Sequence, residues 1–155
     1  MEVLHPRCAG LDVHKKVVAA CVITPGKREV RTFSTITSDL LNLKEWLLEC
    51  QVTQVAMEST GVFWKPIYNV LEDKFSLLLV NAQHIKNVPG RKTDVKDAEW
   101  IAEVTRHGLV RGSFVPDKEQ RELRDIVRYR RSLIQERSRE VNRIQKLLEG
   151  GQHQA

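Results

Sequence analysis

Long apolar runs and paired cysteines are both missing from this sequence, and their absence excludes several classes of protein. No stretch approaches the roughly 20 apolar residues that a membrane-spanning helix needs, and the first seven residues lack the apolar core of a signal peptide. We therefore expect a cytoplasmic protein without a membrane segment. The three cysteines are an odd number without a C-x-x-C spacing, which predicts buried, reduced thiols and neither a disulfide framework nor a zinc knuckle; they are Cys8, Cys21 and Cys50.

The composition is that of a globular protein with an excess of positive charge. Of the 155 residues, 41% are hydrophobic and 29% are charged, which excludes disordered, collagenous and membrane chains and leaves room for one ordinary domain with an appendage. The formal net charge of +5 favours an anionic partner. Many basic proteins bind no nucleic acid, however, so the distribution of the charge matters more than its sum.

The chain changes in both charge and pattern near residue 113. Before that point short strand-like runs alternate with helical ones, whereas a single helical period continues from Pro116 to the Gly150-Gly151 pair. Residues 113–155 also carry ten Lys and Arg side chains against seven acidic ones. We therefore expect two parts: residues 1–112, a mixed α/β domain, and residues 113–155, a basic helical segment.

Residues 1–112 contain apolar runs of strand length that alternate with helical segments. Runs at 8–14, 17–23 and 29–33, separated by a His-Lys-Lys turn and by Pro25-Gly26, predict a three-stranded meander. After the meander we expect a helix at 38–50, a strand at 53–57, a helix that opens after Gly61, a strand at 75–80 and a helix at 94–107. The expected order is β-β-β-α-β-α-β-α.

Residues 113–155 predict one helix of about 33 residues, or about 50 Å at 1.5 Å per residue. A seven-residue count places apolar residues at two core positions of a coiled coil. Arg130 and Arg137 interrupt one of the rows, so the coiled coil is expected to be imperfect, and a lone charged helix is the alternative. The arginines either contact phosphate groups or form a solvated face balanced by Glu136 and Glu140. The apolar rows are Val127, Ile134, Val141 and Leu148, and Leu123 and Ile144.

Four carboxylates stand at positions where each has both an ordinary structural explanation and a chemical one. Asp12 lies within the first strand, where an ionised carboxylate needs compensation unless it is an edge or turn residue. Glu58 ends the fourth strand, where exposure alone would explain it. Asp94 and Asp97 stand three residues apart at a helix start, where they can converge on one point or can simply cap the helix and complement its dipole.

The expected topology gives these carboxylates a common location. In a β-β-β-α-β-α-β-α order the first and fourth strands are neighbours, and the last helix can cross their ends. So many negative charges can share a site only if cations neutralise them, and hard oxygen ligands select Mg²⁺ or Mn²⁺. Asp12, Glu58, Asp94 and Asp97 therefore predict a two-metal site for phosphoryl transfer.

Basic residues surround two of these aspartates in the sequence. A loop shaped by Pro89-Gly90, together with the helix start beyond it, carries several cations, which suit a phosphate backbone. A lysine of the first hairpin adds to them unless it is simply a solvated turn residue. The candidate nucleic-acid-binding residues are Lys15, Lys86, Arg91, Lys92 and Lys96.

Three segments of the sequence resemble motifs of a known family. They are Gly10-Leu11-Asp12-Val13-His14-Lys15, Glu58-Ser59-Thr60-Gly61 and Lys92-Thr93-Asp94-Val95-Lys96-Asp97-Ala98. In this order they resemble the N-terminal domain of the DEDD-type transposases of the insertion sequence 110 family, over nearly all of residues 8–112. The resemblance implies a RuvC-like, ribonuclease-H-like fold in which Asp12, Glu58, Asp94 and Asp97 bind Mg²⁺. It also implies an RNA-guided DNA recombinase that assembles, as a dimer or a tetramer, through the long helix.

One departure from that family is large. Its members continue into a second domain with a nucleophilic serine that acts together with the DEDD site in strand exchange, whereas this sequence stops at Ala155. We therefore expect the N-terminal part of a transposase, truncated before the serine-bearing domain, with an incomplete active site. Its expected partners are DNA, a guide RNA and further copies of itself.

Other functions stay open on the sequence alone. One is a self-sufficient nuclease resembling Holliday-junction resolvases, which use four carboxylates on the same fold. Another is a non-catalytic module for nucleic-acid binding and dimerisation. An actin-like ATPase half is less compatible, because its phosphate loops need glycines where His14-Lys15-Lys16 stands.

Overall fold

The computed structural model describes residues 2–91 and 96–153, and the chain divides into two compact units. The first unit is Met1–Val115 and the second is Pro116–Ala155. Among the described residues, the first unit holds a β-sheet with four helices and the second holds one long helix. None of these helices is long and apolar enough to cross a membrane.

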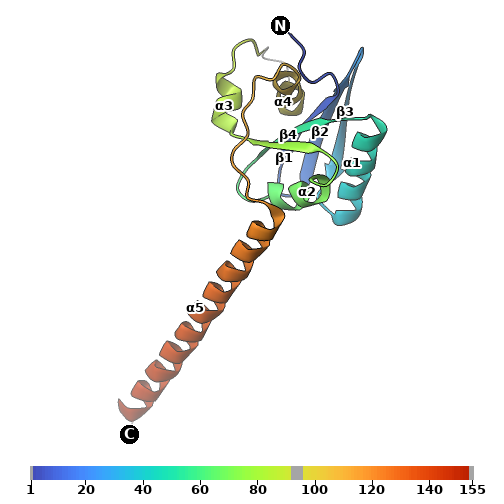
Figure 1. Cartoon of the computed structure of the whole chain (residues 1–155). Helices are drawn as coiled ribbons and strands as arrows, with labels where there is room; N and C mark the ends of the chain where they lie inside the picture. The colour runs from blue at the N-terminus through green and yellow to red at the C-terminus, as the bar shows by residue number, and fades with distance from the viewer. Residues whose placement is uncertain (1, 92–95, 154–155) are drawn as a thin grey trace. The chain divides into compact units, whose positions relative to one another are not determined.

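A five-stranded mixed sheet is the centre of the first unit (Figure 1). Its strands are β1 (Cys8–Val13), β2 (Val17–Thr24), β3 (Lys27–Ser34), β4 (Gln54–Ser59) and β5 (Ser76–Val80). They lie in the order β3-β2-β1-β4-β5; β2 pairs antiparallel with β1 and β3, while β4 pairs parallel with β1 and β5. This arrangement is the ribonuclease-H-like topology that the sequence predicted.

Helices cover both faces of the sheet. The helices of this unit are α1 (Thr37–Glu49), α2 (Trp64–Leu71), α3 (Ala82–Asn87) and α4 (Asp97–Arg106). Figure 1 shows α1 and α2 on one side of the strands and α4 on the other. Because both faces of β1 and β4 are covered, successive residues of these strands enter different cores, which explains their near-continuous apolar sequence.

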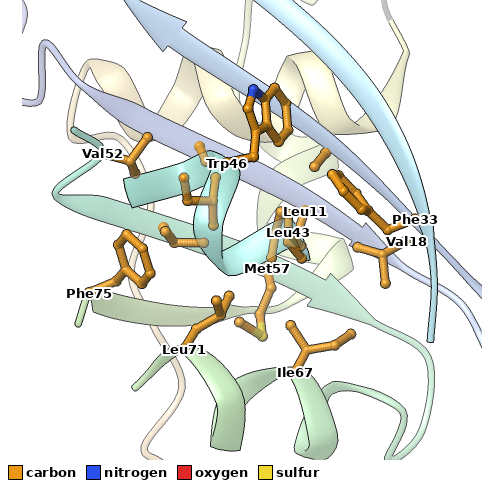
Figure 2. Close-up of a cluster of buried hydrophobic side chains, with 14 of the residues drawn as sticks. Leu11, Val18, Phe33, Leu43, Trp46, Val52, Met57, Ile67, Leu71 and Phe75 are labelled. Atoms are coloured by element: carbon orange, nitrogen blue, oxygen red, sulfur yellow. The ribbon is translucent and has the colours of Figure 1, made fainter. Parts of the chain in front are cut away.

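The larger core fills the space between the sheet and the pair α1 and α2. Leu11 of β1 and Met57 of β4 are fully buried there against Leu43 and Trp46 of α1 (Figure 2). The side chains of α1 enter this core at the helical spacing of three and four residues that the sequence predicted. The opposite residues of β1 and β4 therefore face α4.

Helix α4 approaches β1 more closely than a side chain on the strand would allow. A Cβ on Gly10 would lie 2.3 Å from the backbone nitrogen of Ala102 and 2.6 Å from the backbone oxygen of Ala98. Both alanines are buried against the sheet. Gly10 therefore allows the backbone of α4 to pack directly on β1. The small side chains of Ala98 and Ala102 permit the same close approach from the helix.

Two predictions around α4 were wrong. Residues 82–87, expected as part of a loop, form α3, whose N-cap Asn81 accepts a hydrogen bond from the Gln83 amide at 2.8 Å. Helix α4 begins at Asp97 instead of near residue 94, after an extended N-cap, Lys96, whose side chain makes no capping hydrogen bond. Packing of the α4 alanines on the sheet favours this position of the helix, and a tertiary contact of this kind does not follow from the local sequence pattern.

The second unit is the helix α5 (Lys118–His153). Asp117 precedes it and accepts a hydrogen bond from the Gln120 amide at 2.8 Å, as an N-cap aspartate does. The helix was expected to stop at Gly150-Gly151 but continues through both glycines. One glycine costs a helix only about 1 kcal/mol relative to alanine, so two of them do not end a long helix by themselves.

The cysteines are free thiols. Cys8 and Cys21 are fully buried, as predicted, whereas Cys50 is only half-buried. Burial raises the pKa of Cys8 to about 12 and that of Cys21 to about 11. Both thiols therefore stay protonated at neutral pH and are poor nucleophiles.

Candidate functional site

Asp12 and Glu58 lie side by side where β1 and β4 end. The two strands are parallel and in register, with Asp12 opposite Glu58. Directly opposed residues of parallel strands project from the same face, and the strands themselves are about 4.8 Å apart. Since Leu11 and Met57 enter the α1/α2 core, the two carboxylates project from the α4 face. The sequence prediction that these two residues meet is thus consistent with the observed register.

The electrostatics of Glu58 show which charges gather around it. Its pKa is raised, first because burial disfavours the charged carboxylate, and then because the negative charges of Asp12 and Asp97 repel it. The positive charges of Lys86 and Arg91 act in the opposite direction and lower the pKa. Three acidic and two basic side chains from β1, β4, α3, α4 and the loop before α4 therefore share one neighbourhood.

Asp12 has a partner that the sequence analysis did not assign. The Nε2 atom of His14 lies 3.1 Å from a carboxylate oxygen of Asp12, and the Asp12 side chain is 18% exposed. The signal was present in the sequence, because residues two apart on a strand project to the same side. Whether the His14 ring would turn toward Asp12 depends on the turn that follows β1, which the spacing alone does not specify.

Asp97 occupies the first position of α4 and forms an ion pair with Arg91. A guanidinium nitrogen of Arg91 lies 2.6 Å from a carboxylate oxygen of Asp97, whose side chain is 54% exposed. Asp97 also lies in the first turn of the helix, where a negative charge complements the helix dipole. Asp97 thus lies in the first turn of α4 and close enough to Glu58 to affect its pKa, while its role as a metal ligand stays a prediction.

The remaining predicted site residues fall into two groups. Lys15 and Lys96 are exposed; Lys15 follows the end of β1, and Lys96 precedes Asp97. Lys92 and Asp94 lie outside the residues that the structure describes. The described part of the predicted set therefore consists of three carboxylates and four cations near one end of the sheet.

The donor set of this site matches a hard divalent cation. Asp12 and Glu58 offer carboxylate oxygens, the ligands that Mg²⁺ and Mn²⁺ prefer. Burial and the charges of Asp12 and Asp97 raise the pKa of Glu58, and a bound cation would act in the opposite direction. Within residues 2–91 and 96–153, no group of three His, Cys, Asp or Glu side chains is close enough to hold a metal ion.

Comparison with known proteins adds a family to this geometry. A family model described as a transposase, of the DEDD type and the insertion sequence 110 group, matches residues 9–151. Among solved structures, T. thermophilus RuvC in complex with Holliday junction substrate is similar, with 13% sequence identity and a TM-score of 0.48 over 70% of this chain and 100% of that chain. No curated protein matches the chain.

Proposed function

Because the chain belongs to the DEDD transposases of the insertion sequence 110 family, we propose that it binds DNA and takes part in Mg²⁺-dependent strand cleavage and exchange during transposition. The observation that supports this proposal most is the register of β1 and β4, which places Asp12 opposite Glu58. Two neighbouring carboxylates offer oxygen ligands for a cation, which suits phosphoryl transfer, in which negative charge on the phosphodiester must be stabilised.

In this proposal the four carboxylates of the family motif hold one or two Mg²⁺ or Mn²⁺ ions. Bound ions supply Lewis-acid stabilisation of the charge that develops on a phosphodiester. His14 contributes by fixing the orientation of the Asp12 carboxylate through their 3.1 Å contact. The proposed ligands are Asp12, Glu58, Asp94 and Asp97.

Basic residues beside the carboxylates are proposed to bind the DNA backbone. Arg91 is the best placed, because its guanidinium already pairs with the Asp97 carboxylate and can exchange it for a phosphate oxygen. Lys86 contributes positive charge at Glu58. The full proposed set is Lys15, Lys86, Arg91, Lys92 and Lys96.

The family also supplies proposals for the assembly. We propose that the apolar residues of α5 pair with the same helix of another copy, because Val127, Ile134 and Val141 are each about half exposed in the single chain. A dimer or a tetramer would result. The proposed recombinase also includes a guide RNA and a serine-bearing domain.

Metal-dependent DNA binding tests this proposal. We would measure fluorescence anisotropy of a labelled DNA duplex with the wild-type chain and with Asp12→Asn, with EDTA and with Mn²⁺. The proposal predicts that Mn²⁺ tightens DNA binding by the wild-type chain, because cations at the carboxylates remove their repulsion of phosphate, and that the variant loses this effect.

Two outcomes, one of the anisotropy experiment and one of a separate cleavage assay, would favour the other two functions. Binding that ignores Mn²⁺ in both proteins would contradict the proposal and favour a non-catalytic binding module. Cleavage of a four-way DNA junction by the chain alone with Mg²⁺ would favour a self-sufficient resolvase-like nuclease.

A further inference from the structure

One face of α5 carries basic and amide side chains and no acid between Arg124 and Lys146, a length of about six helical turns. The residues follow one another at spacings of three and four, which places them in one row on a continuous α-helix. All of them are exposed. This row, called the basic stripe from here on, consists of Arg124, Arg128, Arg131, Gln135, Arg139, Asn142 and Lys146.

The acidic and apolar residues of α5 lie on other faces. At 100° per residue, Glu136 and Glu140 fall well to one side of the basic stripe, and Glu140 pairs with Arg143, which lies outside it, at 3.3 Å. Ile126 and Ile144 point away from the stripe. A solvated helix surface ordinarily mixes charges of both signs. The segregation of cations on α5 instead indicates an anionic partner on that face.

The length of the basic stripe fits one kind of anion. From Arg124 to Lys146 the helix rises about 33 Å, at 1.5 Å per residue, which is close to one turn of B-form DNA. Arginine supplies four of the five cations, and its planar guanidinium matches phosphate oxygens in pairs. A straight row of cations of this length suits a stiff, regularly charged backbone better than a folded acidic protein.

We propose that the basic stripe of α5 is a second nucleic-acid-binding surface, one that contacts the phosphate backbone of duplex DNA independently of divalent metal. The choice of DNA rests on the function proposed above. Arg124 and Arg131 lie beside the apolar row of α5, but the rest of the stripe lies farther from that row, so pairing with a second copy would leave most of the stripe accessible. In such a pair each helix presents its own basic stripe to DNA.

Charge-neutral variants of the full chain test this surface. The stripe variant changes Arg128 and Arg139 to Gln, and the matched control changes Lys118 and Arg143 to Gln, so both lose two positive charges from the same helix, away from the apolar rows. Glutamine is nearly as good a helix former as arginine, so circular dichroism should show both variants folded. The affinity for a duplex of about 20 base pairs is then measured in EDTA from about 50 to 200 mM salt.

The stripe variant should bind duplex DNA roughly 10-fold more weakly at about 100 mM salt, with a log-log salt slope shallower by about 2. The control should stay within about threefold of the wild type. Equal losses in both variants would overturn the proposal, because net charge alone would then explain the binding. An unchanged stripe variant, or tighter binding of an RNA duplex than of DNA, would overturn it as well.

Failure of this inference can be told apart from failure of the proposed function. Asp12→Asn should keep the EDTA-resistant binding of the basic stripe while losing the effect of Mn²⁺. If Mn²⁺ never affects the wild-type chain but the stripe and control variants differ as expected, the carboxylate site fails and the stripe stands. If Mn²⁺ acts as expected and the two variants do not differ, the stripe alone fails.

Discussion

The charged carboxylate of Glu58 is disfavoured in the folded chain, whereas the proposed cation binding needs that charge. Its carboxylate is buried enough, and close enough to Asp12 and Asp97, for its pKa to be raised in the folded chain. Lys86 and Arg91 offset only part of this effect. A residue that destabilises its own fold at neutral pH needs another reason to be there, and a bound cation is such a reason.

Thermal unfolding of Glu58→Gln at several pH values tests whether the charge of Glu58 lowers the stability of the chain. Between the ordinary glutamate pKa of 4.5 and its raised pKa in the folded chain, Glu58 is more protonated in the folded than in the unfolded chain, so its contribution to stability falls as the pH rises through this window. In EDTA, Glu58→Gln should therefore raise the Tm relative to wild type at pH 7, and the difference should shrink below pH 4.5. The measurement is thermal unfolding followed by circular dichroism. A lower Tm of the variant at pH 7 would mean that Lys86 and Arg91 overcompensate the charge.

At this scale the sequence predicted the carboxylates but not their partners. Asp12 could be singled out because an ionised group in a strand is costly without compensation. The contact of His14 with Asp12 and that of Arg91 with Asp97 depend on the turn after β1 and on the loop before α4. Neither conformation follows from residue spacing.

At the scale of elements, the contact of β1 with α4 positions the site. Gly10 lies two residues before Asp12 on the same face of β1, and Ala98 follows Asp97 in α4. The close approach at Gly10 therefore holds the start of α4 near the carboxylates of the sheet. A change at Gly10 should disturb both stability and the site.

Gly10→Ala should destabilise the chain by about 1–3 kcal/mol or more, because the added Cβ meets backbone atoms of α4 that cannot turn aside. Gly150→Ala is the matched control, since a Cβ there meets no atom within 4 Å and alanine favours a helix. It should leave stability unchanged or raise it slightly. Urea denaturation measures both, and a Gly10→Ala variant as stable as the control would contradict the close packing of α4 on β1.

The elements themselves differed in how well the sequence specified them. Period-two and period-3.6 patterns located the five strands, α1 and α2, because burial on a defined face imposes those periods. Helix α3 was missed because six residues give too short a pattern. The start of α4 was misplaced because it is decided by packing on Gly10, a contact between segments about 90 residues apart in the chain.

At the scale of the whole molecule, α5 by itself carries exposed apolar residues. Val127, Ile134 and Val141 are 48%, 56% and 47% exposed. Apolar residues at a seven-residue spacing on a long helix are typical of helix pairing. The sequence predicted this spacing, but no property of a single chain specifies how many copies associate.

Replacing Val127, Ile134 and Val141 by Gln should therefore lower the association state of the full chain. Analytical ultracentrifugation should find dimers or larger species for the wild type and a mass near 17.9 kDa for the variant. The first unit has its own cores, so its strand signal in circular dichroism should not change. A variant that associates as the wild type does would show that α5 pairs through other residues or does not pair.

We expect the carboxylates at the ends of β1 and β4 to bind a divalent cation. Calorimetric titration with Mn²⁺ measures this binding directly. The proteins are the wild type, Asp12→Asn, and Asp73→Asn as a control, because Asp73 lies between α2 and β5, at the opposite end of the sheet. We expect saturable binding by the wild type and the control, and at least tenfold weaker binding by Asp12→Asn, about the loss that follows damage to a metal's ligand shell. Equal affinity of all three folded proteins, or no binding by the wild type, would contradict the account.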